Sequence, residues 1–181
     1  MDSPCLGPAS TTAPDSPDLA PAFASDIEKR IREARLRRLY AYWLERRGNR
    51  RMPARRDIDP LDFPYLLGSI MLVDVVREPP CFRVRLHGTE LVRLAAYELT
   101  GKSLDELPSG TYRAYVLERC RLLVETGEPV LVHHDSVLDG RRRRYEALWL
   151  PFADDGDTVT MLLCALIYEH RRGIPRNTPI V

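Results

Sequence analysis

Residues 81–107 read CFRVRLHGTELVRLAAYELTGKSLDEL, and this stretch decides the fold. Apolar residues at positions 82, 84 and 86 alternate with polar ones as far as His87, which is the pattern of a strand with one buried face at the edge of a sheet. The alternation stops at Gly88-Thr89, where Thr89 is a suitable helix N-cap, and Gly101 interrupts the residues that follow. We therefore expect an edge strand followed by short helical segments as far as Leu107.

A central strand and a long helix flank this stretch. Residues 69–77 are apolar on both faces, which indicates a strand that is covered on both sides. Residues 111–125 are followed by Gly127 and Pro129, the usual residues just beyond a helix C-terminus, and are expected to form the long helix. The chain therefore places two strands before the small helices and one long helix after them.

Two turn signals divide the rest of the chain into three strands. Asp139-Gly140 lies between the predicted strands 130–138 and 142–152 and is a strong hairpin signal. Asp154-Asp155-Gly156-Asp157 marks a second turn before the almost wholly apolar segment 158–168, which suits the middle of a sheet. The order of elements predicts an α+β fold with a five-stranded antiparallel sheet and helices on one face.

The N-terminal region adds a helix but no core of its own. Residues 1–24 consist mainly of Pro, Ser, Thr, Ala and Asp and are expected to form a disordered leader, because they offer little to bury. Residues 25–48 are expected to form an Arg-rich amphipathic helix, and the proline-containing residues 49–68 a connector without regular structure. The main domain then spans residues 69–170 and is followed by a tail, 171–181.

The apolar residues of the N-terminal helix point in two directions. At 100° per residue Ile27, Ile31 and Ala34 share one side, while Leu36, Leu39, Tyr40 and Trp43 lie broadly opposite. We expect the side that carries Trp43 to cover the second apolar face of the sheet, and Ile27, Ile31 and Ala34 to form a candidate interaction surface for a partner. The alternative is a kinked N-terminal cap that contacts only its own domain.

Several motifs occur in the order found in one protein family. Over about residues 39–169 the chain resembles the stand-alone bacterial PAS proteins, in which a helix precedes a single PAS unit. The resemblance implies that the last strand pairs with the first. It also implies a non-enzymatic sensory or protein-interaction module, often a homodimer, that signals through a separate protein and whose ligand varies from case to case. The residues that carry the resemblance are Tyr42-Trp43, Pro53, 56–60, 83–89, Leu99-Thr100-Gly101, Leu107 and Leu150-Pro151.

No cofactor, metal or catalytic group is identifiable in the sequence. The long helix lacks the histidine that usually binds haem in such domains, and nothing resembles the Asn-Cys-Arg-Phe-Leu signature of flavin photosensors. The four cysteines lack metal-ligand spacing. His133 and His134 are adjacent on a predicted strand, so they point to opposite faces, and a solvated edge strand is the simpler interpretation. His87 is interpreted as a surface or capping histidine.

The concave face between the long helix and the sheet is the expected place for a small ligand. Tyr97, Tyr115, Arg119 and Trp149 are the candidate pocket residues, and an aromatic wall with one cation would suit an acidic or aromatic metabolite. The alternative is that these residues complete an amphipathic core, with Arg119 exposed to solvent.

Charge and hydropathy bound the partners and the location. Residues 25–56 carry twelve basic and four acidic residues, so an alternative function is a nucleic-acid-associated adaptor that uses this region. However, this region shows no helix-turn-helix pair or basic strand with aromatic residues that could read bases directly, so nucleic acid is the less favoured partner. No secretory signal precedes Lys29, and the longest apolar run, 161–167, is too short to span a bilayer. We expect a cytoplasmic protein without membrane contact.

Overall fold

The computed structural model describes residues 24–77, 81–138 and 141–169. The predicted leader, the predicted tail and the Asp139-Gly140 turn lie outside these residues, apart from Ala24. In chain order the helices are α1 (Ala24–Arg30), α2 (Ala34–Arg47), α3 (Thr89–Ala95) and α4 (Gly110–Thr126). The strands are β1 (Ile70–Val75), β2 (Phe82–His87), β3 (Val130–Leu138), β4 (Arg141–Phe152) and β5 (Met161–Tyr168).

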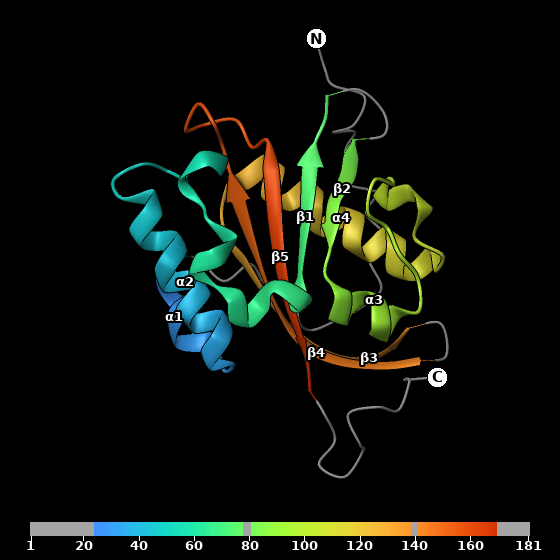
Figure 1. Cartoon of the computed structure of the whole chain (residues 1–181). Coiled ribbons are helices and arrows are strands. Elements are labelled where there is room, and N and C mark those ends of the chain that lie inside the picture. Colours follow the sequence, from blue (N-terminus) through green and yellow to red (C-terminus); the bar gives the residue numbers. More distant parts are fainter. Residues whose placement is uncertain (1–23, 78–80, 139–140, 170–181) are drawn as a thin grey trace.

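The five strands form one antiparallel sheet in the order β2-β1-β5-β4-β3 (Figure 1). The last strand, β5, lies at the centre and pairs with both β1 and β4. Strands β3 and β4 pair as far as Leu138 opposite Arg141, as a hairpin requires. At the next turn an oxygen of Asp155 accepts the backbone N–H groups of Asp157 and Thr158. The predicted α+β fold, with its central last strand, is confirmed.

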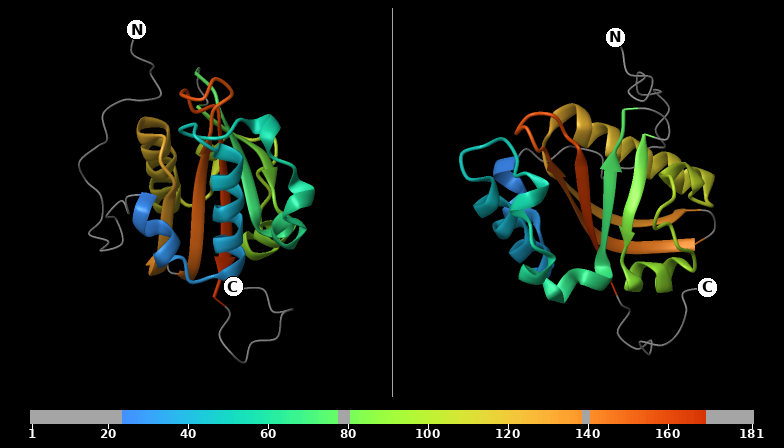
Figure 2. Two further views of the ribbon diagram at one scale, coloured as in Figure 1. Left: turned by 90° about the vertical axis from the view of Figure 1, so that its left-hand side faces the viewer. Right: turned by 45° about the horizontal axis from the view of Figure 1, so that its top comes forward.

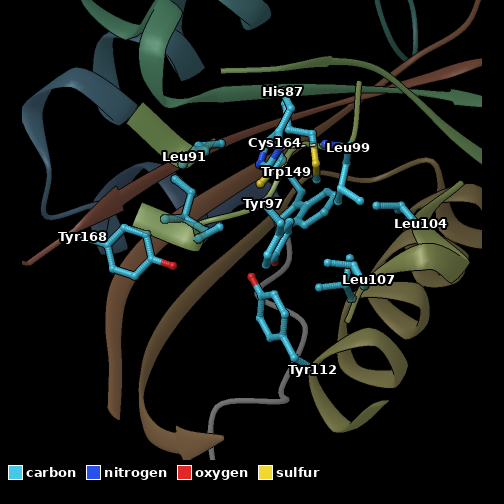
Figure 3. Close-up of a pocket in the computed structure, with 14 residues that line it drawn as sticks. His87, Leu91, Tyr97, Leu99, Leu104, Leu107, Tyr112, Trp149, Cys164 and Tyr168 are labelled. Atoms are coloured by element: carbon cyan, nitrogen blue, oxygen red, sulfur yellow. Dashed lines mark hydrogen bonds between the residues drawn. The ribbon is translucent and has the colours of Figure 1, made fainter. Parts of the chain in front are cut away.

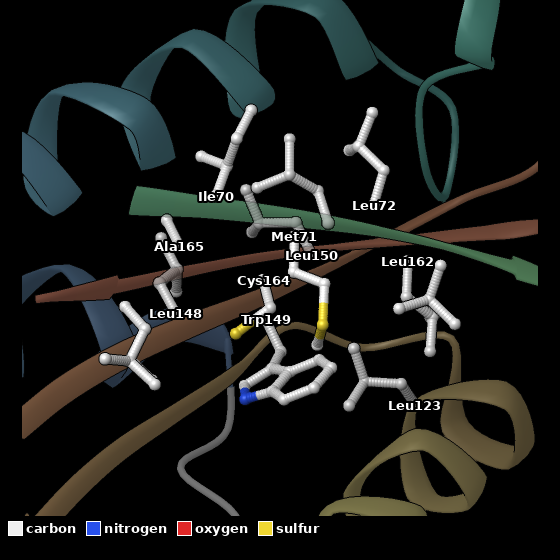
Figure 4. Close-up of a cluster of buried hydrophobic side chains, with 14 of the residues drawn as sticks. Ile70, Met71, Leu72, Leu123, Leu148, Trp149, Leu150, Leu162, Cys164 and Ala165 are labelled. Carbon is white, nitrogen blue, oxygen red and sulfur yellow. The ribbon is translucent and has the colours of Figure 1, made fainter. Parts of the chain in front are cut away.

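Both faces of the sheet are covered, because its central strands are apolar on both sides. Ile70 and Leu72 point to one face of β1, while Met71 and Val73 point to the other, and all four are buried. Figure 4 shows the N-terminal segment above Ile70 and Leu72, and α4, which carries Leu123, on the opposite side. Figure 2 shows α2 and α4 separated by the strands. Each fully buried side chain of this size contributes roughly 1.5–3 kcal/mol, so removing either cover would expose a large apolar face.

The N-terminal region forms two helices instead of the single helix expected from the sequence. The helix is interrupted at residues 31–33. There the buried carboxylate of Glu146 on β4 accepts the N–H groups of Arg32 (2.8 Å) and Glu33 (2.9 Å). Because of this bend Ile27 (0% exposed) and Ile31 (1%) pack into the same core as Trp43. The expectation that their side of the helix faces outward assumed one straight helix and was wrong for both; only Ala34 is exposed.

The connector contains three short 3-10 helices, although its prolines suggested no regular structure. They are η2 (Arg55–Asp57), η3 (Pro60–Asp62) and η4 (Pro64–Ser69). Pro60 and Pro64 each stand at the first position of their helix, where a missing N–H is tolerated. The prolines therefore start these turns.

Gly88 explains why β2 stops where it does. Its N–H donates to the Ile70 carbonyl over 2.8 Å, and a Cβ at this position would lie 2.5 Å from the carbonyl oxygen of Gly68. Only glycine fits, and α3 begins at the next residue. The outer edge of β2 pairs with the following loop, since Val84 exchanges hydrogen bonds with Gly101 and Lys102.

The other predicted elements are close to those observed. The long helix α4 begins after Ser109, whose hydroxyl accepts the Tyr112 N–H, and ends at Gly127, whose φ is 63°. Strand β2 is an edge strand, but Leu86 is 37% exposed, so the expectation of three buried alternate residues was wrong at this position. A register shift between Leu72 and Val73 interrupts the alternation there.

Candidate functional site

The candidate site is a cavity of about 50 Å³ between α4, the segment from α3 to η5 (Leu104–Glu106), and the sheet (Figure 3). Its lining is mostly aromatic and aliphatic, as in typical small-molecule sites. The residues are Met71, His87, Leu91, Ala95, Tyr97, Leu99, Leu104, Leu107, Tyr112, Val116, Trp149, Cys164, Leu166 and Tyr168.

Local backbone geometry places the wall residue Tyr97. Helix α3 ends at Ala96, which adopts a left-handed conformation with φ of 62° and donates its N–H to Val92. This turn brings the chain back over the sheet, and Tyr97 lies against His87 with ring centroids 6.1 Å apart. A non-glycine residue in this conformation is uncommon, so the end of α3 is held there by its surroundings.

Two of the four predicted pocket residues line the cavity. Tyr97 comes from the segment after α3 and Trp149 from β4. Tyr115 and Arg119 lie outside the lining, on a neighbouring row of α4. The Arg119 guanidinium stacks over the Tyr115 ring at 4.0 Å and contacts the Glu118 carboxylate at 3.1 Å.

Arg119 therefore belongs to the packing between α4 and β3. It is only 3% exposed, so the alternative in which this residue faces solvent was also wrong. The Tyr115 ring meets the imidazole of His134 at 5.4 Å. The sequence periodicity predicted the correct helix. It did not resolve which of two adjacent rows of side chains on α4 faces the cavity.

His87 is a lining residue that the sequence reasoning did not assign to the site. Its side chain is 6% exposed, which contradicts a surface position, and its Nδ1 accepts the Leu99 N–H over 3.3 Å. Burial lowers the pKa of His87, and the Glu98 carboxylate, 3.7 Å away, partly opposes this. The neutral imidazole therefore fixes the loop that carries Leu99. The sequence feature that could have pointed to His87 is its position at the end of the predicted strand, directly before Gly88.

Arg143 supplies the cation beside the cavity. Successive residues of a strand point to opposite faces, so Arg142 and Arg144 approach Asp135 while Arg143 turns toward α4. Its guanidinium lies over the Tyr112 ring at 4.5 Å. The guanidinium hydrogen-bonds the Tyr168 hydroxyl, while its buried Nε has no hydrogen-bond partner among the described residues. Arg143 was not among the candidate pocket residues named from the sequence.

Three tyrosines surround this guanidinium. Burial raises the pKa of Tyr97, Tyr112 and Tyr168, and the nearby Arg143 acts against this rise for each of them. Figure 3 shows the hydroxyl groups of Tyr112 and Tyr168 pointing toward the middle of the labelled side chains. At neutral pH these phenols are protonated, so the site offers hydroxyl donors beside one positive charge.

The two adjacent histidines on β3 do point to opposite faces. His134 is 7% exposed and stacks on Tyr145 at 4.7 Å, so the expectation of a solvated strand was wrong for this residue. His133 lies on the other face, with Nε2 3.4 Å from a Glu146 oxygen. Within residues 24–77, 81–138 and 141–169 no group of three or more His, Cys, Asp or Glu side chains is placed to hold a metal ion.

No helix in the described part of the chain is long and apolar enough to cross a membrane.

A match to a family model agrees with this fold. The model described as PAS domain matches residues 31–167. The chain therefore belongs to the PAS domain family, whose members are sensory and signalling modules and are generally non-catalytic. The resemblance proposed from the sequence motifs is confirmed.

Among solved structures, the PAS domain of BvgS from Bordetella pertussis is 18% identical with a TM-score of 0.47, covering 64% of this chain and 90% of that chain. A LOV protein of Rhodobacter sphaeroides is 17% identical with a TM-score of 0.42, covering 64% of this chain and 71% of that chain. VqmA of Vibrio cholerae is 14% identical with a TM-score of 0.43, covering 66% and 55%. The search of curated proteins found no match.

Proposed function

We propose that this chain is a non-enzymatic sensory PAS module in which a small ligand in the cavity controls binding to a separate signalling protein. The observation that carries the proposal is the cavity itself, which is enclosed by α4, the α3–η5 segment and the sheet. A ligand there touches three parts of the fold at once. It therefore favours whichever arrangement of those parts binds it best.

The size of the cavity limits the ligand. A water molecule needs roughly 10–15 Å³ of such volume, and an engineered cavity of about 150 Å³ binds benzene. The observed cavity of about 50 Å³ accepts a group of only a few non-hydrogen atoms. Haem and flavin are much larger than this space, so we propose a small ligand in place of either cofactor.

The lining supports a binding role better than a catalytic one. Burial raises the pKa of the Cys164 thiol well above its usual range, so it stays protonated and is a poor nucleophile. The lining tyrosines are protonated and His87 is neutral and engaged with the backbone. In the part of the chain that the structure describes, no carboxylate lines the cavity to form an acid–base pair with them.

The outer surface of α1 and α2 is the proposed contact for the signalling partner and for a homodimer. Ile27 and Ile31 are buried, so they contribute only if α1 moves away, whereas Ala34 is exposed in the present arrangement. Nucleic acid stays the less favoured partner, because part of the basic surface is already neutralised. Arg46 pairs with Asp62 and Arg50 with Asp57. A cytoplasmic location remains our expectation.

The test is occupancy of the cavity by small molecules in the full-length chain. Native mass spectrometry of freshly purified protein is followed by a library of small metabolites, read out by tryptophan emission and thermal unfolding. Trp149 lies in the lining and Trp43 on the other face of the sheet, so a Trp43→Phe variant isolates the signal from the site. A compound that shifts both the emission and the melting temperature supports the proposal. Protein of unmodified mass that responds to no compound would overturn it.

A further inference from the structure

We propose that the ligand of this cavity is a short-chain monocarboxylate, with its apolar end in the cavity and its carboxylate at Arg143. The inference rests on the proposed function and names the chemical class of the ligand.

The first argument is the unbalanced charge of Arg143. In the same strand Arg142 pairs with Asp135 over 2.9 Å, and Arg144 pairs with Glu169 over 2.6 Å. Within the described parts of the chain Arg143 has no carboxylate partner. Its guanidinium hydrogen-bonds the neutral Tyr168 hydroxyl, but its buried Nε has no acceptor there. A buried charged donor without an acceptor is costly, and an anionic ligand at this position would supply the acceptor.

The second argument is the geometry of the donors around it. A guanidinium binds a carboxylate through two parallel N–H groups, which favours a planar anion. Stacking on Tyr112 at 4.5 Å restricts the orientation of the Arg143 plane. The hydroxyl groups of Tyr112 and Tyr168 point toward the middle of the lining side chains (Figure 3), and burial keeps them protonated, so they add neutral donors. Among the described residues, no acidic side chain lines the cavity to repel an anion.

The third argument is the rest of the lining, which determines the polarity and size of the part of the ligand away from Arg143. The segment from α3 to α4 contributes the apolar side chains Leu91, Leu99, Leu104 and Leu107. A space of about 50 Å³ is roughly a third of the volume that holds benzene. Two or three methylene or methyl carbons fit this space, as in propionate and butyrate. Phosphate would meet Arg143 but would leave the apolar space unfilled.

The experiment compares charged and neutral ligands on the unmodified full-length chain by isothermal titration calorimetry. Acetate, propionate, butyrate, hexanoate and inorganic phosphate are titrated, together with butyramide, which keeps the shape of butyrate but lacks its charge. Butyrate and propionate are expected to bind more tightly than hexanoate, and at least about tenfold more tightly than butyramide or phosphate, because a hydrogen-bonded charge is lost in the amide.

Two variants assign the effect to one arginine. Arg143→Gln is expected to weaken butyrate binding by at least about tenfold, while Arg142→Gln, on the opposite face of the same strand, leaves it unchanged. Circular dichroism checks that both variants are folded; if Arg143→Gln is not, the butyrate and butyramide comparison on the unmodified chain decides alone.

The outcomes separate the two proposals. Butyramide binding as tightly as butyrate, or a folded Arg143→Gln variant that binds butyrate normally, would overturn the carboxylate assignment. A neutral compound that perturbs Trp149 in that case leaves the sensory function standing. Phosphate binding equal to that of butyrate would show a general anion site and also overturn the assignment. If no compound of any class binds, both proposals fail.

Discussion

Replacing Glu146 by glutamine tests how the N-terminal helices are held on the sheet. The buried Glu146 carboxylate accepts two backbone N–H groups, at 2.8 and 2.9 Å, where the chain passes from α1 to α2. A hydrogen bond to a charged group contributes about 1.5–3 kcal/mol. The glutamine side chain keeps one acceptor oxygen but turns an NH₂ group toward the second N–H, so one bond is lost and one donor is left unpaired.

The expected loss of stability is somewhat smaller than one charged bond, because a neutral amide is also less costly to bury. We expect Glu146→Gln to lower the free energy of unfolding by about 1–2 kcal/mol, which corresponds to roughly 2–8 °C in the melting temperature. The opening should be local, so the amides of Arg32 and Glu33 should exchange faster than those of β5.

Urea denaturation followed by circular dichroism gives the global value, and amide hydrogen exchange gives the local one. Glu45→Gln, an exposed position on α2, is the matched control and should change neither. A Glu146→Gln protein with an unchanged urea midpoint and unchanged protection of Arg32 and Glu33 would refute the role assigned to this carboxylate.

Three further substitutions test the site and the fold. Burial lowers the pKa of His87, so its contribution to stability is complete above about pH 6.5 and is lost as the pH falls through the folded-state pKa. The difference in unfolding free energy between the native chain and His87→Gln should therefore narrow from pH 7.5 to 5, and a constant difference would contradict this. Gly88→Ala would place a Cβ 2.5 Å from a backbone oxygen and should destabilise the fold by about 3 kcal/mol. Gly110→Ala, whose nearest contact is 3.9 Å away, is the control; equal melting temperatures for the two variants would count against the argument. Trp43→Phe removes a 3.1 Å indole hydrogen bond to a carbonyl of β4 and should cost about 1–2 kcal/mol, which an unchanged urea midpoint would disprove.

Local sequence signals predicted most of the fold. The Gly88-Thr89 break predicted the end of β2, and Gly127 predicted the end of α4. The apolar residues 158–168 predicted a central strand. The glycine signals involve only a few neighbouring residues, and a strand that is buried on both faces is apolar along its whole length. Both kinds of pattern can therefore be recognised in a single sequence.

The elements that were missed depend on contacts between distant residues. The break between α1 and α2 relies on Glu146, which lies 114 positions from Arg32 in the chain. Nothing within residues 25–48 contains this acceptor, so the segment resembles one continuous helix. Local sequence alone cannot identify a helix boundary at which the backbone N–H groups are accepted by a side chain on a distant strand.

Half of the candidate site was missed for a related reason. Periodicity places Tyr115 and Arg119 on the buried side of α4 but does not distinguish two neighbouring rows, and only the row of Tyr112 and Val116 reaches the cavity. Arg143 was not named as a candidate because it belongs to four consecutive arginines, and such a run usually indicates solvated charge. Strand alternation would have separated Arg143, which faces α4, from Arg142 and Arg144.

The central position of β5 has a consequence for synthesis of the chain on a ribosome. Until β5 has emerged, β1–β2 and β3–β4 are two separate hairpins, because among the described strands it is β5 that pairs with both β1 and β4. Helices α1 and α2 are made first, yet the surface that they cover is completed only by this last strand. Such late, long-range pairing slows folding and prolongs the exposure of apolar strands. The nascent protein should therefore depend on protection by chaperones until β5 closes the sheet.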